Sequence, residues 1–193
     1  MFDLRFPTQQ SYAYAYLQDA KSSHAAQLHR AHELFNNVVH KGIFLKLLAK
    51  VLRRPRCLLD LNGFQPHVVG SSYAGLRAVR IDNIVGSAGR LEDFDLDFLP
   101  INDRMRERWV SIAMAANAFA PLPPVELVQV GEEYFVRDGH HRISVARARR
   151  QEMIDADVTA WQLDPHFLTN EAHQTRRSWW PARSHSKYLS ISW

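Results

Sequence analysis

The sequence predicts an α+β protein in which a small mixed β-sheet with packed helices is preceded by a helical N-terminal segment. Three observations support this prediction. Residues 11–52 contain no proline and repeat apolar residues at helical spacing. Residues 76–162 combine short apolar runs, typical of strands, with periodic helical stretches. With 193 residues, 46% of them hydrophobic, the chain can form one compact core with a helical appendage.

Charge and cysteine content restrict the class of protein. The formal net charge of +4 permits an anionic partner without requiring one. Cys57 is the only cysteine, which excludes an intramolecular disulfide and a cysteine-based zinc site, and fits a reducing cytoplasm. The most apolar run, residues 43–52, carries Lys46 and Lys50 and is half the length of a membrane-spanning helix, which needs roughly 20 residues. We therefore expect a cytoplasmic protein with no membrane partner.

Four segments are expected along the chain. Residues 1–59 form the helical N-terminal segment, whose helix ends near 53–56 because Pro55 disfavours helix in the residue before it. Residues 60–75, rich in glycine and serine, are predicted to be a linker. Residues 76–162 form the α+β domain, and residues 163–193, with three tryptophans, are expected to be an irregular tail packed on the body.

The first half of the α+β domain reads as a strand followed by a helix. Residues 76–85 predict a short strand, closed by Gly86 and Gly89. After an acidic segment, Asn102 or Asp103 is expected to cap a helix whose apolar residues recur at intervals of three and four. Such a stripe is typical of core packing rather than of a cofactor site. Its members are Met105, Trp109, Ile112, Ala116 and Phe119.

The second half begins with a β-hairpin. The motif P-L-P-P at 121–124 ends the helix, and residues 125–130 and 134–137 predict two strands joined by a turn at 131–133. The second strand runs directly into D-G-H-H-R at 138–142, followed by a helix at 143–150 and a short strand at 155–161. The D-G-H-H-R motif therefore lies where a strand turns into a helix.

This turn has the chemistry of a phosphate site. The first backbone N–H groups of a helix lack partners within the helix, its dipole favours negative charge, and Gly139 lets a ligand approach closely. Arg142 offers a planar fork of donors, and His140 and His141 add donors that can pair with phosphate or stack on a base. Asp138 can cap the helix or help to hold a phosphate-bound metal ion.

The same residues allow two other interpretations, of which the first remains open and the second is weaker. The motif also fits a plain capped turn with histidines on the surface. A zinc site is less favoured, because adjacent histidines point in different directions and no cysteine completes a tetrahedral set. His29 and His32 can share one helical face, but a solvated face explains them better. We therefore predict no metal-binding site made by the protein alone.

The order of these elements resembles a known family. Residues 76–162 resemble the nucleotide-binding domain shared by chromosome-partitioning ParB proteins, sulfiredoxins and related free-serine kinases. Residues 139–142, G-H-H-R, stand where ParB proteins carry G-E-R-R and sulfiredoxins carry G-G-C-H-R, and D-G-H-H-R is most similar to the kinase-like branch. Arg90 and the following Phe94-Asp95 resemble the R-x-x-F-D part of a ParB motif.

The resemblance implies a nucleotide ligand. Gly139, His140, His141 and Arg142 would bind the phosphates of ATP, ADP or CTP, with Mg²⁺ as the accompanying ion. His140 replaces the nucleophilic cysteine of sulfiredoxins, so sulfiredoxin chemistry is not expected. The missing G-E-R-R puts a preference for CTP in doubt. The chain after residue 162 is too short for a helix-turn-helix module, so DNA or RNA binding would not be sequence-specific.

Phosphoryl transfer also needs a base or a metal-binding carboxylate near the phosphates. The candidates for catalysis are Asp138, His140 and Glu92, and the loop 86–90 adds Ser87 and Arg90 as phosphate contacts. Glu92 belongs to an acidic segment that the resemblance places beside the nucleotide. Each of its carboxylates is, however, better explained as a residue facing solvent. The acidic residues are Glu92, Asp93, Asp95 and Asp97.

Two functions follow. The first is a nucleotide-binding protein that hydrolyses or transfers a phosphate, as a phosphohydrolase or small-molecule kinase. The alternative is a non-enzymatic regulatory module that binds a nucleotide or nucleic acid through basic residues. These are Arg147, Arg149, Arg150, Arg176 and Arg177. The sequence leaves open the oligomeric state and the role of the N-terminal helices.

Overall fold

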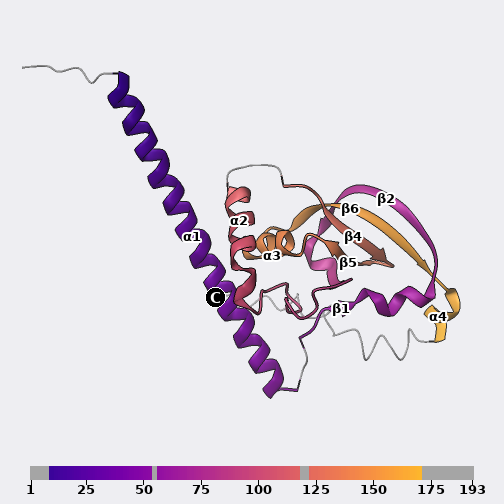
Figure 1. The fold of residues 1–193 in the computed structure, drawn as a ribbon. Helices are drawn as coiled ribbons and strands as arrows, with labels where there is room; N and C mark the ends of the chain where they lie inside the picture. The colour runs from indigo at the N-terminus through magenta and orange to yellow at the C-terminus, as the bar shows by residue number, and fades with distance from the viewer. Residues whose placement is uncertain (1–8, 54–55, 118–121, 171–193) are drawn as a thin grey trace, which may run out of the picture.

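The computed structural model describes residues 9–53, 56–117 and 122–170, and in these it is α+β, as predicted. A long N-terminal helix lies outermost, two shorter helices lie between it and a six-stranded sheet, and short helices lie on the side of the strands away from α1 (Figure 1). The helices are α1 (Gln9–Val51), α2 (Arg106–Asn117), α3 (His140–Ala148) and α4 (Pro165–Asn170), with 3-10 helices η1 (Leu61–His67), η2 (Ile81–Asn83) and η3 (Asp103–Met105).

The sheet is mixed, with the strand order β1-β3-β5-β4-β6-β2. β1 and β3 are parallel, β3 and β5 are parallel, and β4 and β6 are parallel, whereas β4–β5 and β2–β6 are antiparallel pairs. The hairpin predicted at 125–137 is therefore confirmed as β4 and β5 in the centre of the sheet. The strands are β1 (Leu59–Asp60), β2 (Val68–Arg80), β3 (Ile84–Ser87), β4 (Val125–Val130), β5 (Glu133–Asp138) and β6 (Met153–Leu163).

The predicted N-terminal helix is confirmed as one continuous helix, α1, but residues 60–75 differ from the expected linker. Asp60 belongs to β1, and the other residues form η1 and the first half of β2. β2 pairs with β6 along its length, so its backbone polar groups are used in the sheet, as they are not in an open linker. Ile81, expected in a strand, lies in η2. Residues 171–193 of the expected tail, and Phe119, lie outside the described residues.

Both faces of the sheet are covered. On one face, Ile143 and Ala146 of α3 pack against apolar residues of β4 to β6 such as Leu127 and Val158. On the other face, Phe64 of η1 contacts the ring of Phe135 at a centroid distance of 5.4 Å. Alternating side chains of a strand point to opposite faces, so β4 and β5 contribute to both layers. Among the described residues, no helix is long and apolar enough to cross a membrane.

One tryptophan on α2 connects the three helices of the helical layer. Trp109, from the predicted stripe, is fully buried on α2, and its ring lies 5.5 Å from the ring of Phe35 on α1. Its indole N–H donates a hydrogen bond of 2.9 Å to the buried Ser144 Oγ on α3. A buried indole N–H needs such a partner. Trp109 therefore connects α1, α2 and α3, and so fixes the helix that carries the D-G-H-H-R motif.

We expect Trp109→Phe to lower the free energy of unfolding by about 2–4 kcal/mol, because it removes buried volume and leaves the Ser144 hydroxyl without its donor. Urea denaturation measures this loss. The double variant Trp109→Phe, Ser144→Ala should be less destabilised than the sum of the two single variants. Strictly additive losses would show that the hydrogen bond contributes nothing.

Candidate functional site

The site is built on the turn between β5 and α3. Gly139 occupies this turn with φ +101°, in the left-handed region that favours glycine. A Cβ atom at this position would lie 2.5 Å from Cγ1 of Val125 on β4. Glycine is therefore required here twice, by the backbone angle and by the closeness of the neighbouring strand. Because α3 begins at His140, the motif residues 140–142 form its first turn.

His140 is held inside the protein by Ser87. Its Nε2 atom lies 2.5 Å from Oγ of Ser87, the last residue of β3, and both side chains are buried. Ser87 Oγ also accepts a 3.1 Å hydrogen bond from the backbone N–H of Gly89 and contacts the Val136 carbonyl at 3.3 Å. The serine is 0% exposed, so the pair cannot act as a surface nucleophile and base. It positions the loop after β3 against α3.

His141 is also buried, which corrects the interpretation of these histidines as surface residues. The His141 ring meets the Phe94 ring edge-on, with 5.5 Å between the ring centroids. The His140 ring is stacked with the same Phe94 ring, with 6.0 Å between the centroids. Among the described residues, Nδ1 of His141 has no hydrogen-bond partner, although only 6% of the residue is exposed. A buried polar atom of this kind costs about 1–3 kcal/mol when unpaired, which marks the position as one suited to a polar ligand.

The environment keeps both imidazoles neutral. Burial lowers the pKa of His140 to about 4, with a further lowering by the charge of Arg90. Burial likewise lowers the pKa of His141 to about 4, and the charges of Arg108 and Arg90 act in the same direction. Near neutral pH, each ring can therefore accept a hydrogen bond at one nitrogen and donate at the other. The two guanidinium groups supply the positive charge of this region.

Arg142, predicted to bind phosphate, is held by the protein itself. Its guanidinium donates to the carbonyl oxygens of Pro123 and Pro124 at 2.5 and 2.6 Å, and to the carboxylate of Asp138 at 2.7 Å. These contacts fasten the segment before β4 to the first turn of α3. Phosphate binding by Arg142 stays a prediction, but several of its donors already have partners.

The remaining predicted residues lie at different depths. Asp138 is exposed and pairs with Arg142, and Glu92 is exposed in the loop after β3. Arg90 is about half exposed, has φ +55°, and reaches the carboxylate of Asp93 at 3.4 Å. Ser87 and the histidines are thus inside, whereas Arg90, Asp138 and Glu92 are open to solvent. Burial is the main cause of the lowered pKa values of His140 and His141, and the positive charge of Arg90 adds to it at both rings.

One acidic residue departs from the expectation that these carboxylates face solvent. Asp95 is 2% exposed, and its Oδ1 accepts hydrogen bonds of 2.9 Å from the backbone N–H groups of Asp97 and Leu99. Burial raises the pKa of Asp95, while these backbone bonds lower it. Its other oxygen accepts from Arg56, just after α1. Asp95 therefore shapes its loop and ties it to the N-terminal segment.

Arg147, expected on a basic binding face, also has a structural position. Its Nη2 donates to the carbonyl oxygens of Ile81 and Ile84, at 2.8 and 3.3 Å, and Nη1 lies 3.5 Å from Asp97. Arg149 and Arg150 are exposed, and the predicted Arg176 and Arg177 lie outside the described residues. In the part of the chain that the structure describes, only Arg149 and Arg150 of the predicted basic surface are therefore exposed.

Arg108 was not among the predicted site residues, and Asn102 was predicted only as a helix cap. Arg108 lies in the first turn of α2 and acts on His141, although nothing in the sequence joins residues 108 and 141. Asn102 precedes η3 as expected, but its side chain makes no capping bond there. It donates to Asp93 at 3.1 Å instead, and its Oδ1 is a second buried atom without a partner among the described residues.

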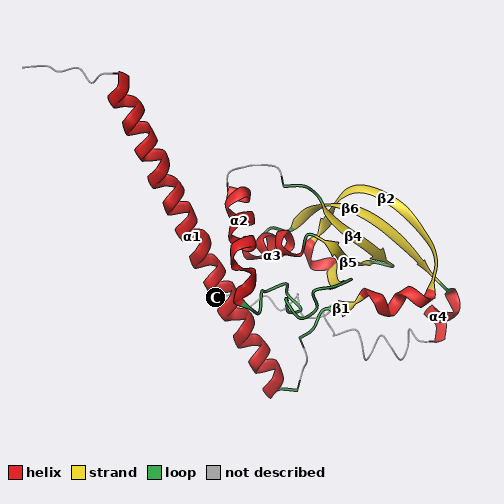
Figure 2. Cartoon of the chain, in the orientation of Figure 1, coloured by secondary structure: helices red, strands yellow, loops and turns green. Residues whose placement is uncertain are grey.

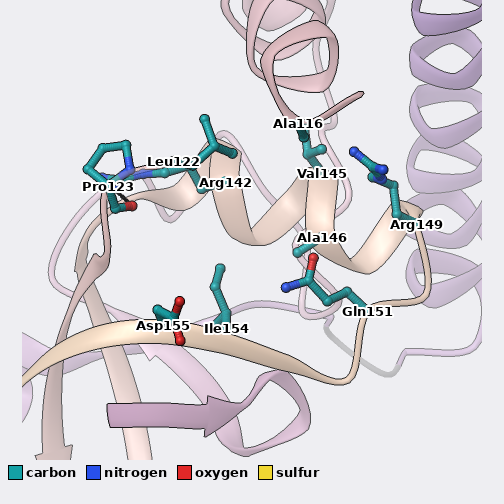
Figure 3. A pocket seen from close by; sticks show the side chains of 10 residues that line it. All are labelled: Ala116, Leu122, Pro123, Arg142, Val145, Ala146, Arg149, Gln151, Ile154 and Asp155. Carbon is teal, nitrogen blue, oxygen red and sulfur yellow. Dashed lines mark hydrogen bonds between the residues drawn. The ribbon is translucent and has the colours of Figure 1, made fainter. Parts of the chain in front are cut away.

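A separate cavity of about 430 Å³ lies beside α3 (Figure 3). Arg142, Val145, Ala146 and Arg149 line one wall at helical spacing, so the cavity follows one face of α3 toward Ile154 and Asp155 of β6. His140 and His141 are not part of its lining. Among the described ranges, no group of three or more histidine, cysteine or acidic residues is arranged to hold a metal ion.

Comparison with known proteins does not show a family for this chain. No family model and no curated protein matches the chain. Among solved structures, the sulfiredoxin of Arabidopsis thaliana is similar over 43% of this chain and 82% of its own, with 13% sequence identity and a TM-score of 0.34. A likeness at this level carries no function, substrate or mechanism to the chain.

We expect Gly139→Ala to destabilise the protein by about 2–4 kcal/mol, because the new methyl group meets Val125 and the residue must keep a positive φ. Gly131→Ala is the matched control, since Gly131 also has a positive φ, of +63°, but nothing lies within 4 Å of its Cβ position. Chemical denaturation of both variants separates the two effects. Equal losses would rule out the steric contribution of Val125.

The two histidines also predict a pH dependence of stability. Their pKa values are lowered in the folded state, so the unfolded chain binds more protons between about pH 6.5 and 4. Stability should be fully present above pH 6.5 and fall toward pH 4, by up to about 3 kcal/mol for each ring. The raised pKa of Asp95 acts in the opposite direction. Urea midpoints measured across this range should change less in His141→Gln, and a flat wild-type profile would contradict the assignment.

Proposed function

We propose that the protein binds a nucleotide whose phosphates lie at the first turn of α3, between Arg90 and Arg108. The observation that carries this proposal is the buried Nδ1 atom of His141, which has no partner in the described part of the chain and lies within the field of both guanidinium groups. A helix start, two cations and an unpaired polar atom at one place favour an anionic ligand with hydrogen-bonding groups.

The backbone of α3 supports the same location. The first bond of this turn runs from the N–H of Ile143 to the carbonyl of Gly139. The N–H groups of residues 140–142 precede it and therefore have no carbonyl within the helix to bind. The dipole of the helix adds partial positive charge at this end. A phosphate here would receive backbone donors from α3 and charged donors from Arg90 in the loop after β3 and from Arg108 on α2.

In this proposal the buried histidines are positioning residues. His140, locked to Ser87, would hold the loop that carries Arg90, and His141 would meet the ligand through its free nitrogen. Hydrolysis or transfer of a phosphate would need an exposed carboxylate, and Asp138 and Glu92 are the available candidates. Mg²⁺ commonly binds through substrate phosphates and one or two carboxylates, a role that Asp138 could share.

The alternative function is a non-enzymatic regulatory module that binds a nucleotide or a nucleic acid. Its nucleotide-binding form differs from the first function only in lacking turnover. Its nucleic-acid form is less favoured, because Arg147 binds backbone carbonyls instead of facing outward. Binding to DNA or RNA would also depend strongly on salt. Binding measurements with free nucleotides and with DNA or RNA at several salt concentrations therefore distinguish the nucleotide-binding form from the nucleic-acid-binding form.

We expect ATP, ADP or CTP, with Mg²⁺, to raise the thermal unfolding temperature of the full chain. Arg90→Ala and Arg108→Ala should each weaken binding about tenfold or more, since each removes a charge-assisted contact. Isothermal titration with each nucleotide measures the affinity, and phosphate release shows whether turnover occurs. Arg142→Ala is a poor probe, because its contacts hold the protein together.

Arg80→Ala is the control, because Arg80 is an exposed arginine at the end of β2. It should leave the affinity for nucleotide unchanged. The proposal fails if no nucleotide stabilises the chain, or if all three arginine variants weaken binding equally. Salt-sensitive binding of DNA or RNA that survives both site variants would favour the alternative.

A further inference from the structure

The last turns of α1 expose a row of large apolar side chains. Phe44, Leu47, Leu48 and Val51 are 64%, 60%, 41% and 78% exposed. Their spacing of three, one and three residues places them on one face of the helix. An exposed apolar row of this kind on a soluble domain commonly marks an interaction surface. We call these four residues the apolar stripe.

The apolar stripe faces away from the body of the protein. The opposite side of α1 is the packed one: Ala49 is buried, and a Cβ atom at Gly42 would lie 2.7 Å from the carbonyl oxygen of Pro100. Gly42 and Ala49 are seven residues apart and so share a face, which is not that of Phe44 and Val51. Figure 2 shows α1 as the outermost element, with its C-terminal end reaching past α2.

The charges around the apolar stripe have one sign. Lys46 and Lys50 lie within this stretch, Lys41 and Arg53 lie at its two ends, and all four are exposed. No aspartate or glutamate occurs between Glu33 and Asp60. The partner of this surface must therefore accept apolar side chains and also carry negative charge.

We propose that the apolar stripe and its surrounding cations dock the protein on an anionic lipid surface. A second copy of this stretch of α1 has no aspartate or glutamate and would give the cations no negative partner, and a nucleic acid would leave the apolar row uncovered. In an anionic bilayer, the apolar side chains enter the boundary of the acyl chains while the lysines extend to the headgroups. The helix lies in the plane of the membrane and does not cross it.

This inference goes beyond the proposed function and does not depend on it. The expectation of no membrane partner rested on the lack of a spanning segment and did not consider docking of a helix on the surface. In this arrangement, the sheet and α3 stay on the aqueous side of α1, because the packed face of the helix is turned toward them.

Co-sedimentation of the full chain with vesicles tests the proposal. The protein should bind vesicles of phosphatidylcholine with phosphatidylserine and bind vesicles of phosphatidylcholine alone at least about tenfold more weakly. Leu47→Glu should reduce binding about tenfold or more, because a charge replaces an inserted side chain. Lys50→Gln should reduce it about fivefold, and added salt should weaken the wild type.

Leu76→Glu is the matched control, since Leu76 lies on β2 and is 63% exposed, close to the 60% of Leu47. It should leave vesicle binding unchanged, and the urea midpoints of all variants should confirm that they fold. Lack of binding to the anionic vesicles would overturn the proposal. So would equal binding to both kinds of vesicle, or a wild-type dimer that Leu47→Glu converts to a monomer in light scattering.

Discussion

The close approach of Gly139 to Val125 is the constraint on which the arrangement of the site depends. Because the turn fits only glycine, β5 can end beside β4 and continue at once into α3. The direction of α3 then brings His140 onto Ser87 and places Ser144 where the indole of Trp109 reaches it. One residue without a side chain thus determines where three helices and the loop after β3 meet. A change at this turn would therefore affect both the residues proposed to bind phosphate and the helical layer.

The sequence allowed the elements with local signals to be predicted. Alternation, turn residues and helical spacing predicted the hairpin, the helix after it and the buried apolar positions of α2. Each of these signals depends on neighbours within a few positions. The glycine of D-G-H-H-R was assigned to the turn for the same reason. The fold class followed from the order of these elements, because the number of strands and helices limits the layers that can bury them.

The features that sequence reasoning missed depend on distant partners. His141 is buried because α2 and the loop around Phe94 cover it, and Arg147 faces inward because the carbonyl oxygens of residues 81 and 84 lie opposite. A charged residue that alternates with apolar ones normally faces solvent, yet Asp95 finds two backbone donors within its own loop. Composition alone made residues 60–75 resemble a linker, although their hydrogen-bond partners lie in β6. Such burial is decided by tertiary contacts and not by local pattern.

The position of β2 at the edge of the sheet has a consequence for how the chain folds. β2 pairs only with β6 in the sheet order, and the two strands are separated by the whole of β3 to α3. During synthesis β2 must wait, unpaired, until β6 has left the ribosome, and the entropy of closing so long a loop slows the final step. In that interval Val69, Tyr73 and Leu76 lie on a strand with two open edges. The longest strand among the described residues thus gains its partner only late in synthesis, and its open edges make the nascent chain prone to aggregation until then.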